Sequence, residues 1–220
     1  MRIKDESLVR GLLVPNMGRL RLPDSLYADI ARTGALLRGH FALQSGHHSE
    51  YFLRFSQLGW DAEALTNIAQ LLLEQPPFRV NEPTFLCSEA AGLFLGSAIA
   101  RRWTGSKLAV LKMDARKRPT EVLREGVLTP GGDVVVVDDV VTQGRSLETF
   151  LKQAQMAEAR VQGVLTFAVL KPDEFKARLH AAELSAGWLL EARWPTHPAA
   201  ECPLCEQDAA DLPLPAFELI

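Results

Sequence analysis

Val134-Val135-Val136-Val137-Asp138-Asp139-Val140-Val141-Thr142-Gln143-Gly144-Arg145-Ser146 is the most informative run in the sequence. Its four leading β-branched residues predict a strand that is buried on both faces. Two acids stand where we expect the strand to leave the sheet, and a short loop leads into a helix predicted over 147–159. A strand, a small-residue loop and a helix start predict a phosphate site, because backbone N–H groups and the helix dipole converge there. The acids would repel phosphate, so we expect them to bind sugar hydroxyls or hydrated Mg²⁺.

The same run resembles the phosphoribosyl-diphosphate (PRPP) motif of the type I phosphoribosyltransferases: four hydrophobic residues, two acids, two hydrophobic residues, then Thr-x-Gly-x-Ser. The resemblance implies that the two acids hold the ribose hydroxyls and contribute to catalysis, and that the loop holds the 5-phosphate. An ordinary buried strand with a polar exit turn would explain the valines but not the rest of the run. The PRPP-binding residues implied are Asp138, Asp139, Val140, Val141, Thr142, Gln143, Gly144, Arg145 and Ser146.

The bulk properties are those of an ordinary globular protein. The 220 residues suit one domain, and a composition 47% hydrophobic and 23% charged is typical of this class. The formal net charge of −3 gives no basic surface for nucleic acid. No apolar run is long enough to span a membrane, and the N-terminus has no secretory signal. Three cysteines fit a reducing cytoplasm, so we expect a cytoplasmic protein.

Residues 34–52 predict two short strands around a Ser-Gly turn, after a helix that begins at Asp24 or Ser25 and runs to about Arg38. This region resembles the N-terminal signature of orotate phosphoribosyltransferases, in which Gly-Ala-Leu, Gly-x-Phe-x-Leu-x-Ser-Gly and Ser-Pro-Tyr-Tyr follow one another. In that family the region forms a hood over the base. We expect His47 and His48 to be surface residues of the turn. The base-binding residues implied are Tyr51, Phe52, Arg54 and, beyond the phosphate loop, Glu148.

Two further regions are candidates for binding pyrophosphate. A strand predicted over 84–87 leads through a small-residue loop into a helix over 93–101, which suits either an anion or close helix–strand packing. Residues 113–125 are polar, basic and without periodicity, so they predict either a solvated loop or a mobile lid over a departing pyrophosphate. The resemblance favours the lid, with Lys117 as its catalytic lysine. The pyrophosphate-binding residues implied are Ser88, Glu89, Ala90, Ala91, Gly92, Lys112 and Arg116.

Strands alternate with helices along the chain, which predicts an α/β protein with a parallel sheet covered on both faces. Besides the elements above, we expect helices over 61–74 and 173–184 and strands over 107–112, 161–170 and 188–190. The resemblance implies the type I phosphoribosyltransferase fold: a mostly parallel twisted sheet flanked by helices, with a small N-terminal hood. A single domain would then cover 1–220, with a hood of about 1–60 plus a tail of about 195–220, and a core of about 61–194.

The tail contains Cys202-Pro203-Leu204-Cys205, with His197 before it. Two cysteines at this spacing and a histidine suit part of a tetrahedral zinc site, but the sequence shows no fourth ligand. A redox pair and plain structural cysteines are the alternatives, and we expect zinc to be the less favoured outcome. Some orotate phosphoribosyltransferases carry a similar Cys-Pro-Leu-Cys near the C-terminus.

The resemblance implies a glycosyltransferase that moves ribose 5-phosphate from PRPP to a nucleobase, most readily orotate, in pyrimidine biosynthesis. It implies Mg²⁺ arriving with PRPP, and a homodimer in which residues 113–125 reach the partner's site. One departure concerns the base: the arginine that commonly faces the orotate carboxylate is replaced here by Glu148. Orotate would then need Arg145 or Arg54 as its cation. The alternatives are a diverged paralogue with another base and a PRPP-sensing regulator without turnover.

Overall fold

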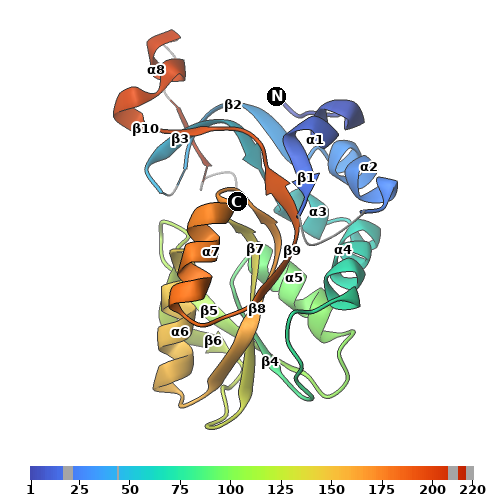
Figure 1. The fold of residues 1–220 in the computed structure, drawn as a ribbon, viewed down its shortest axis with the longest axis vertical. Helices are drawn as coiled ribbons and strands as arrows, with labels where there is room; N and C mark the ends of the chain where they lie inside the picture. Colours follow the sequence, from blue (N-terminus) through green and yellow to red (C-terminus); the bar gives the residue numbers. More distant parts are fainter. Residues whose placement is uncertain (17–21, 44, 208–212, 217–220) are drawn as a thin grey trace.

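A seven-stranded sheet forms the centre of the computed structural model, which describes residues 1–16, 22–43, 45–207 and 213–216 (Figure 1). Within these residues the strand order is β1-β9-β8-β7-β4-β5-β6. The pairs among β4, β5, β7, β8 and β9 are parallel, and only the edge strands β1 and β6 are antiparallel to their described neighbours. The sheet is thus mostly parallel, as predicted. Its strands are β1 (Leu13–Pro15), β4 (Thr84–Ser88), β5 (Lys107–Met113), β6 (Pro119–Glu125), β7 (Asp133–Val141), β8 (Arg160–Val169) and β9 (Ala186–Ala192).

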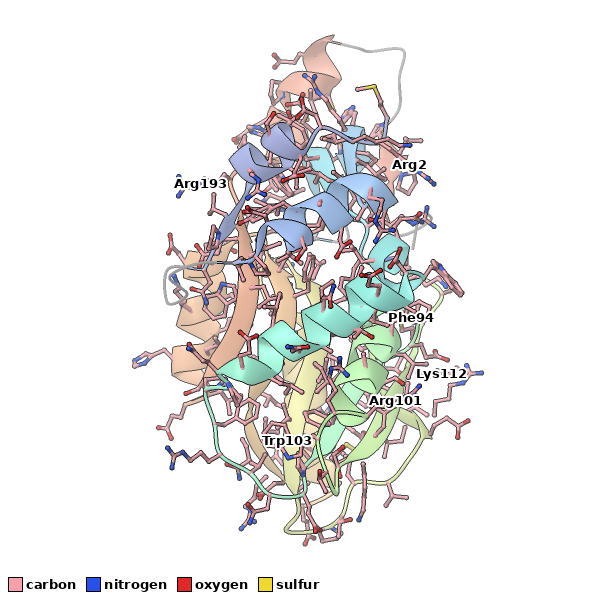
Figure 2. The ribbon with its side chains drawn as sticks, turned by 90° about the vertical axis from the view of Figure 1, so that its right-hand side faces the viewer. Arg2, Phe94, Arg101, Trp103, Lys112 and Arg193 are labelled. Carbon is pink, nitrogen blue, oxygen red and sulfur yellow. The ribbon has the colours of Figure 1, made fainter. Side chains whose placement is uncertain are left out.

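Helices cover both faces of this sheet. Helices α4 (Ala62–Glu74) and α5 (Ala91–Ala100) pack on one face, and α6 (Ser146–Met156) and α7 (Pro172–Ala181) on the other (Figure 1). Figure 2 looks onto the face covered by α4 and α5. Alternate valines of β7 enter the two separate cores, because successive side chains of a strand point to opposite faces. The four valines are therefore buried on both sides, which confirms the strand predicted from them.

A second, smaller sheet lies above the main one in Figure 1, and we call it the hood sheet. Its described strands are β10 (Thr196–Pro198), β3 (His47–Leu53), β2 (Leu36–Ala42) and β11 (Leu214–Pro215), in that order. The hairpin predicted around the Ser-Gly turn is β2 and β3, while the two outer strands come from the C-terminal tail. The remaining elements are α1 (Glu6–Leu12), α2 (Asp24–Thr33), α3 (Ser56–Gly59), η1 (Ala199–Glu201) and α8 (Pro203–Gln207).

Three local predictions were wrong. Helix α2 does not reach Arg38 but ends at Thr33, because Gly34 adopts a left-handed cap with φ +65°. Strand β7 does not end before the acids but continues to Val141, because β8 is long enough to pair with it there. Residues 113–125 are not one irregular loop, since 119–125 form the edge strand β6.

The N-terminal residues that the sequence left uninterpreted form α1 and β1, apart from 17–21, which lie outside the described residues. Asp61 caps α4 as predicted, with its carboxylate accepting from the Ala64 amide at 3.0 Å. None of the described helices has the length and apolar character that crossing a membrane requires.

Candidate active site

A cavity of about 530 Å³ lies between the hood and the carboxyl ends of the neighbouring strands β4 and β7. From β4 the chain goes on to β5 on one side, and from β7 it goes on to β8 on the other. The strand order therefore reverses at this point, which is where open α/β sheets bind ligands. The lining residues that matter below are Ser88, Glu89, Ala91, Asp114, Lys117, Arg118, Asp138, Asp139, Val140, Thr142, Gln143, Gly144, Arg145, Ser146 and Thr149, with Leu43, Phe52, Arg54 and Ala216 from the hood side.

The loop 142–146 joins the end of β7 to the start of α6 and forms one wall of the cavity. Gly144 takes φ +77°, and a Cβ there would lie 2.7 Å from the Phe175 ring, so only glycine fits without a shift. The Ser146 hydroxyl, at the first residue of α6, donates to Asp138 Oδ2 at 3.1 Å. Strand, glycine turn and helix start thus follow one another in the order that an anion site uses, with the positive end of the α6 dipole at the loop.

Asp138 and Asp139 are half-buried in the C-terminal half of β7 and line the cavity. Asp138 Oδ1 accepts the Asp139 amide at 3.1 Å. Burial raises the pKa of Asp138, and burial together with the charge of Asp138 raises the pKa of Asp139. Two adjacent carboxyls with raised pKa values in a cavity have the character of a functional site, because they contribute little to packing.

The second small-residue loop, 88–92, connects β4 to α5. Ala90 has φ +62° and ψ −115°, a conformation that residues with a Cβ rarely adopt, so the loop carries backbone strain. Glu89 accepts the Met113 amide at 2.7 Å and forms an ion pair with Arg124, which ties this loop to the β5–β6 hairpin. Ser88, Glu89 and Ala91 line the cavity, whereas Ala90 and Gly92 are not among its lining residues.

The turn between β5 and β6 brings basic side chains to the cavity. The Asp114 carboxylate accepts the amides of Arg116 and Arg118 at 2.8 and 2.9 Å, and it forms an ion pair with the Arg118 guanidinium. This turn places Lys117 and Arg118 among the lining residues. Lys112 and Arg116, which the sequence also proposed for pyrophosphate, are exposed and are not among them.

The predicted base-binding residues are divided by the structure. Phe52 and Arg54 of the hood line the cavity. Tyr51 packs against Trp194, with 5.6 Å between ring centroids, and Glu148 forms an ion pair with Arg178 of α7. Neither Tyr51 nor Glu148 is a lining residue.

Some lining residues were missed by sequence reasoning. Asp114 and Arg118 gave only a weak signal in the sequence, an aspartate four residues before an arginine within a basic stretch. An aspartate at this place could have been interpreted as the start of an Asx-type turn. Leu43, Thr149 and Ala216 carried no signal, because their contribution depends on how the hood and α6 meet.

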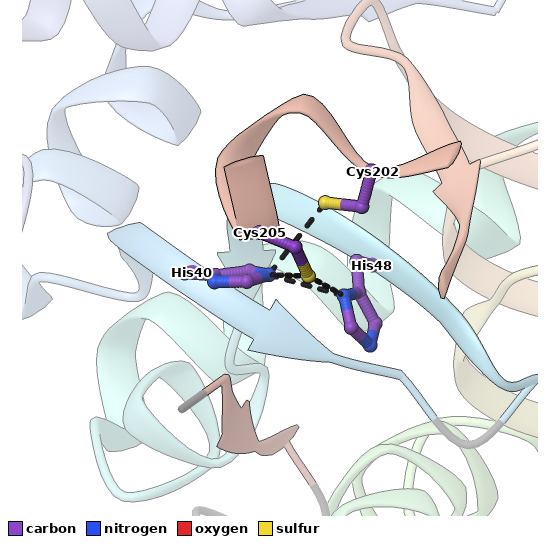
Figure 3. Close-up of side chains that lie close together, drawn as sticks. All are labelled: His40, His48, Cys202 and Cys205. Atoms are coloured by element: carbon purple, nitrogen blue, oxygen red, sulfur yellow. Dashed lines mark hydrogen bonds between the residues drawn. The ribbon is translucent and has the colours of Figure 1, made fainter. Parts of the chain in front are cut away.

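Cys202 and Cys205 meet His40 of β2 and His48 of β3 (Figure 3). The candidate His197 lies in β10 opposite His48 and is not part of this group. His48 is buried in a strand, so the expectation of a surface turn residue was wrong for it. A group of two imidazoles and two thiols has the composition of a metal site.

No family model matches the chain, but comparison with known proteins finds relatives over most of its length. An orotate phosphoribosyltransferase of Chlorobaculum parvum is 32% identical over 177 residues, covering 80% of this chain and 86% of the relative. One of Thermus thermophilus is 33% identical over 180 residues, covering 80% and 92%.

Among solved structures, an orotate phosphoribosyltransferase of Aeropyrum pernix is similar with a TM-score of 0.61 at 23% identity, covering 72% of this chain and 89% of that one. The structure of Leishmania donovani UMP synthase gives a TM-score of 0.62 at 18% identity, covering 86% of this chain and 39% of that one. At these identities the structural likeness establishes the fold alone.

Proposed function

Because this chain belongs to the orotate phosphoribosyltransferase family, we propose that it transfers ribose 5-phosphate from PRPP to orotate, with release of pyrophosphate. One observation carries the proposal beyond the family: two half-buried carboxylates stand directly beside an anion-binding loop in one cavity. Carboxylates accept hydrogen bonds from sugar hydroxyls, and the loop suits a phosphate. Ribose 5-phosphate carries both hydroxyls and a phosphate.

The parts of PRPP have distinct partners in this proposal. Asp138 and Asp139 accept hydrogen bonds from the ribose 2- and 3-hydroxyls. Loop 142–146 and the start of α6 hold the 5-phosphate. The carboxylates are hard oxygen donors that suit Mg²⁺, and the ion, when bound, would offset the charge of the pyrophosphate. Catalysis then consists mainly of positioning and of charge stabilisation, since a ribosyl cation-like centre develops beside the two carboxylates.

The departing pyrophosphate faces loop 88–92 and the β5–β6 turn. Backbone N–H groups around the strained Ala90 are oriented by the neighbouring start of α5, which has ten residues and begins at Ala91. Lys117 and Arg118 supply positive charge from the β5–β6 turn. Lys117 is the catalytic lysine in this proposal, because it is the lysine of the β5–β6 turn that lines the cavity.

Orotate lies under the hood in this arrangement. Phe52 offers an apolar ring and Arg54 a guanidinium at the hood side of the cavity. A carboxylate in a closed site needs a cation or several donors, and Glu148 supplies neither. We therefore assign the orotate carboxylate to Arg54.

A homodimer is part of the proposal. The edge strand β6 exposes Val122, at 55%, and Val127 beyond its end is 70% exposed. Apolar side chains on an open sheet edge favour contact with another chain. A partner placed here would also meet the β5–β6 turn that carries Lys117. Analytical ultracentrifugation tests the dimer, and a monomer at micromolar concentration would contradict it.

The activity is tested by measuring pyrophosphate release from PRPP and Mg²⁺ with orotate, uracil, adenine and hypoxanthine. We expect turnover with orotate in the wild type and its loss in the double variant Asp138→Asn/Asp139→Asn. The circular dichroism spectrum of the variant should show that it is still folded without PRPP. Turnover with a different base would identify a diverged paralogue, and PRPP binding without any turnover would identify a regulator. Unchanged PRPP affinity in the double variant, measured by calorimetry, would remove the two acids from the site.

A further inference from the structure

Four potential metal ligands from three separate chain segments converge on the outer part of the hood (Figure 3). His40 comes from β2 and His48 from β3, while Cys202 and Cys205 come from the tail around the start of α8. Their ligand atoms all lie within 4.8 Å of one another. His48 and Cys202 are buried, and His40 and Cys205 are half-buried. This group is separate from the cavity, because none of its members is a cavity-lining residue.

Four of the six distances between these atoms are close to the edge lengths of a coordination tetrahedron. His40 Nε2 lies 3.1 Å from His48 Nδ1, and His48 Nδ1 lies 3.2 Å from Cys205 Sγ. His40 Nε2 lies 3.6 Å from each of the two sulfurs. Zinc–nitrogen and zinc–sulfur bonds of ordinary length at tetrahedral angles require ligand separations of about 3.3–3.8 Å. Small shifts would therefore bring all four atoms to one ion.

Hydrogen bonding alone satisfies this group poorly. Each short contact needs one proton between its two atoms, and a neutral imidazole has only one N–H to give. His40 Nε2 faces three of the group's atoms at once, whereas its buried Nδ1 has no hydrogen-bond partner among the described residues. Thiols are weak donors and weak acceptors. A single cation would satisfy all four ligand atoms together.

We propose that His40, His48, Cys202 and Cys205 bind one Zn²⁺ ion. Two imidazoles and two thiolates in a tetrahedron are a ligand set that zinc prefers, and all four positions are filled by protein. A closed set of this kind leaves no position for a substrate, so the ion has a structural role. The proposal does not depend on the reaction proposed above.

The ion would fasten the C-terminal tail to the hood. Strand β10 pairs with β3 before the two cysteines, and β11 pairs with β2 after them. Beyond β11, Ala216 packs with Phe41 and Leu43, and both Ala216 and Leu43 line the cavity. A metal between β2, β3 and α8 thus fixes the short tail strands, which have few backbone pairs of their own, and holds the hood wall of the cavity in place.

Metal analysis of the full chain, purified without chelator, provides the direct test. We expect about one zinc per chain in the wild type, and a loss of most of it in His48→Ala and Cys205→Ser. His47→Ala is the matched control, since the neighbouring side chain on β3 points to the other face and should keep the zinc. Cys87→Ala is the control for thiol removal, because Cys87 is buried in the main core instead.

Cobalt substitution gives a second readout that needs no variant. Co²⁺ added to the metal-depleted protein should give the intense visible bands of a tetrahedral, thiolate-ligated ion, and added Zn²⁺ should abolish them. Depletion should also expose the tail after Thr196 to limited proteolysis, while the far-ultraviolet spectrum of the core persists. A wild type that neither carries zinc nor gives the cobalt spectrum would overturn the proposal. So would a Cys202–Cys205 disulfide in freshly isolated protein, because oxidised sulfurs cannot bind the ion.

Discussion

The assignment of the orotate carboxylate to Arg54 makes a quantitative prediction. Arg54 follows β3, and its amide donates to the Ala35 carbonyl at 2.7 Å, which fixes its backbone against β2. Its Nε donates to the Ser56 hydroxyl at 3.2 Å, and this hydrogen bond restricts the orientation of the planar guanidinium. The side chain is half-buried, and charge-assisted bonds in such a place are screened less than on the surface.

Arg54→Ala should therefore remove roughly 1.5–3 kcal/mol of binding to the carboxylate. That corresponds to a loss of about ten- to a hundredfold in kcat/KM for orotate. Arg54→Lys should recover part of the loss, because an ammonium keeps the charge but not the planar fork. The KM for PRPP should change much less, since loop 142–146 and not Arg54 holds the 5-phosphate in this proposal. Steady-state kinetics with each substrate varied in turn measures both quantities.

Arg38→Ala is the matched control. Arg38 also belongs to the hood hairpin, but it is exposed and forms an ion pair with Glu50 at 2.8 Å. We expect its kcat/KM to stay within about twofold of the wild type. If Arg54→Ala also stays within that range while Arg145→Ala loses activity toward orotate, the carboxylate binds at the phosphate loop and our placement of the base is wrong.

Three further predictions concern the rest of the cavity. Lys117→Ala should lower kcat about ten- to a thousandfold with a much smaller effect on PRPP affinity, while Lys107→Ala, exposed on the same hairpin, should leave kcat unchanged. Gly144→Ala should destabilise the protein by about 1–3 kcal/mol in urea unfolding, because its backbone has φ +77° and Phe175 occupies the Cβ position. Burial raises the pKa of Asp139, so its ionisation opposes folding, and stability is lost as the pH rises through that raised pKa. Asp139→Asn should therefore gain stability over the wild type as the pH rises, and a pH-independent difference would contradict the raised pKa.

The sequence predicted those parts of the protein whose signal is local. A run of valines, two acids and a glycine loop within thirteen residues predicted β7, the start of α6 and the wall that they form. Strand β6 was not predicted, because most of its residues are exposed at the sheet edge and the sequence therefore lacks the period-2 pattern of a half-buried strand. In the group around His40, the two cysteines were named from the sequence as possible zinc ligands, but His40 and His48 were not. The members of the group are up to 165 residues apart, and the pairing of the tail strands with the hood brings them together.

Glu148 shows why a departure from a family pattern has to be judged in three dimensions. A carboxylate in the first turn of α6 favours the helix but would repel a phosphate bound at the same helix start. Arg178 of α7 forms an ion pair with Glu148, and its side chain also lies beside Gly144 of the phosphate loop. The pair therefore places a cation next to the loop from a neighbouring helix, and it draws Glu148 away from the cavity. Glu148→Arg would place the new guanidinium next to that of Arg178. We therefore do not expect this substitution to provide a cation for the orotate carboxylate.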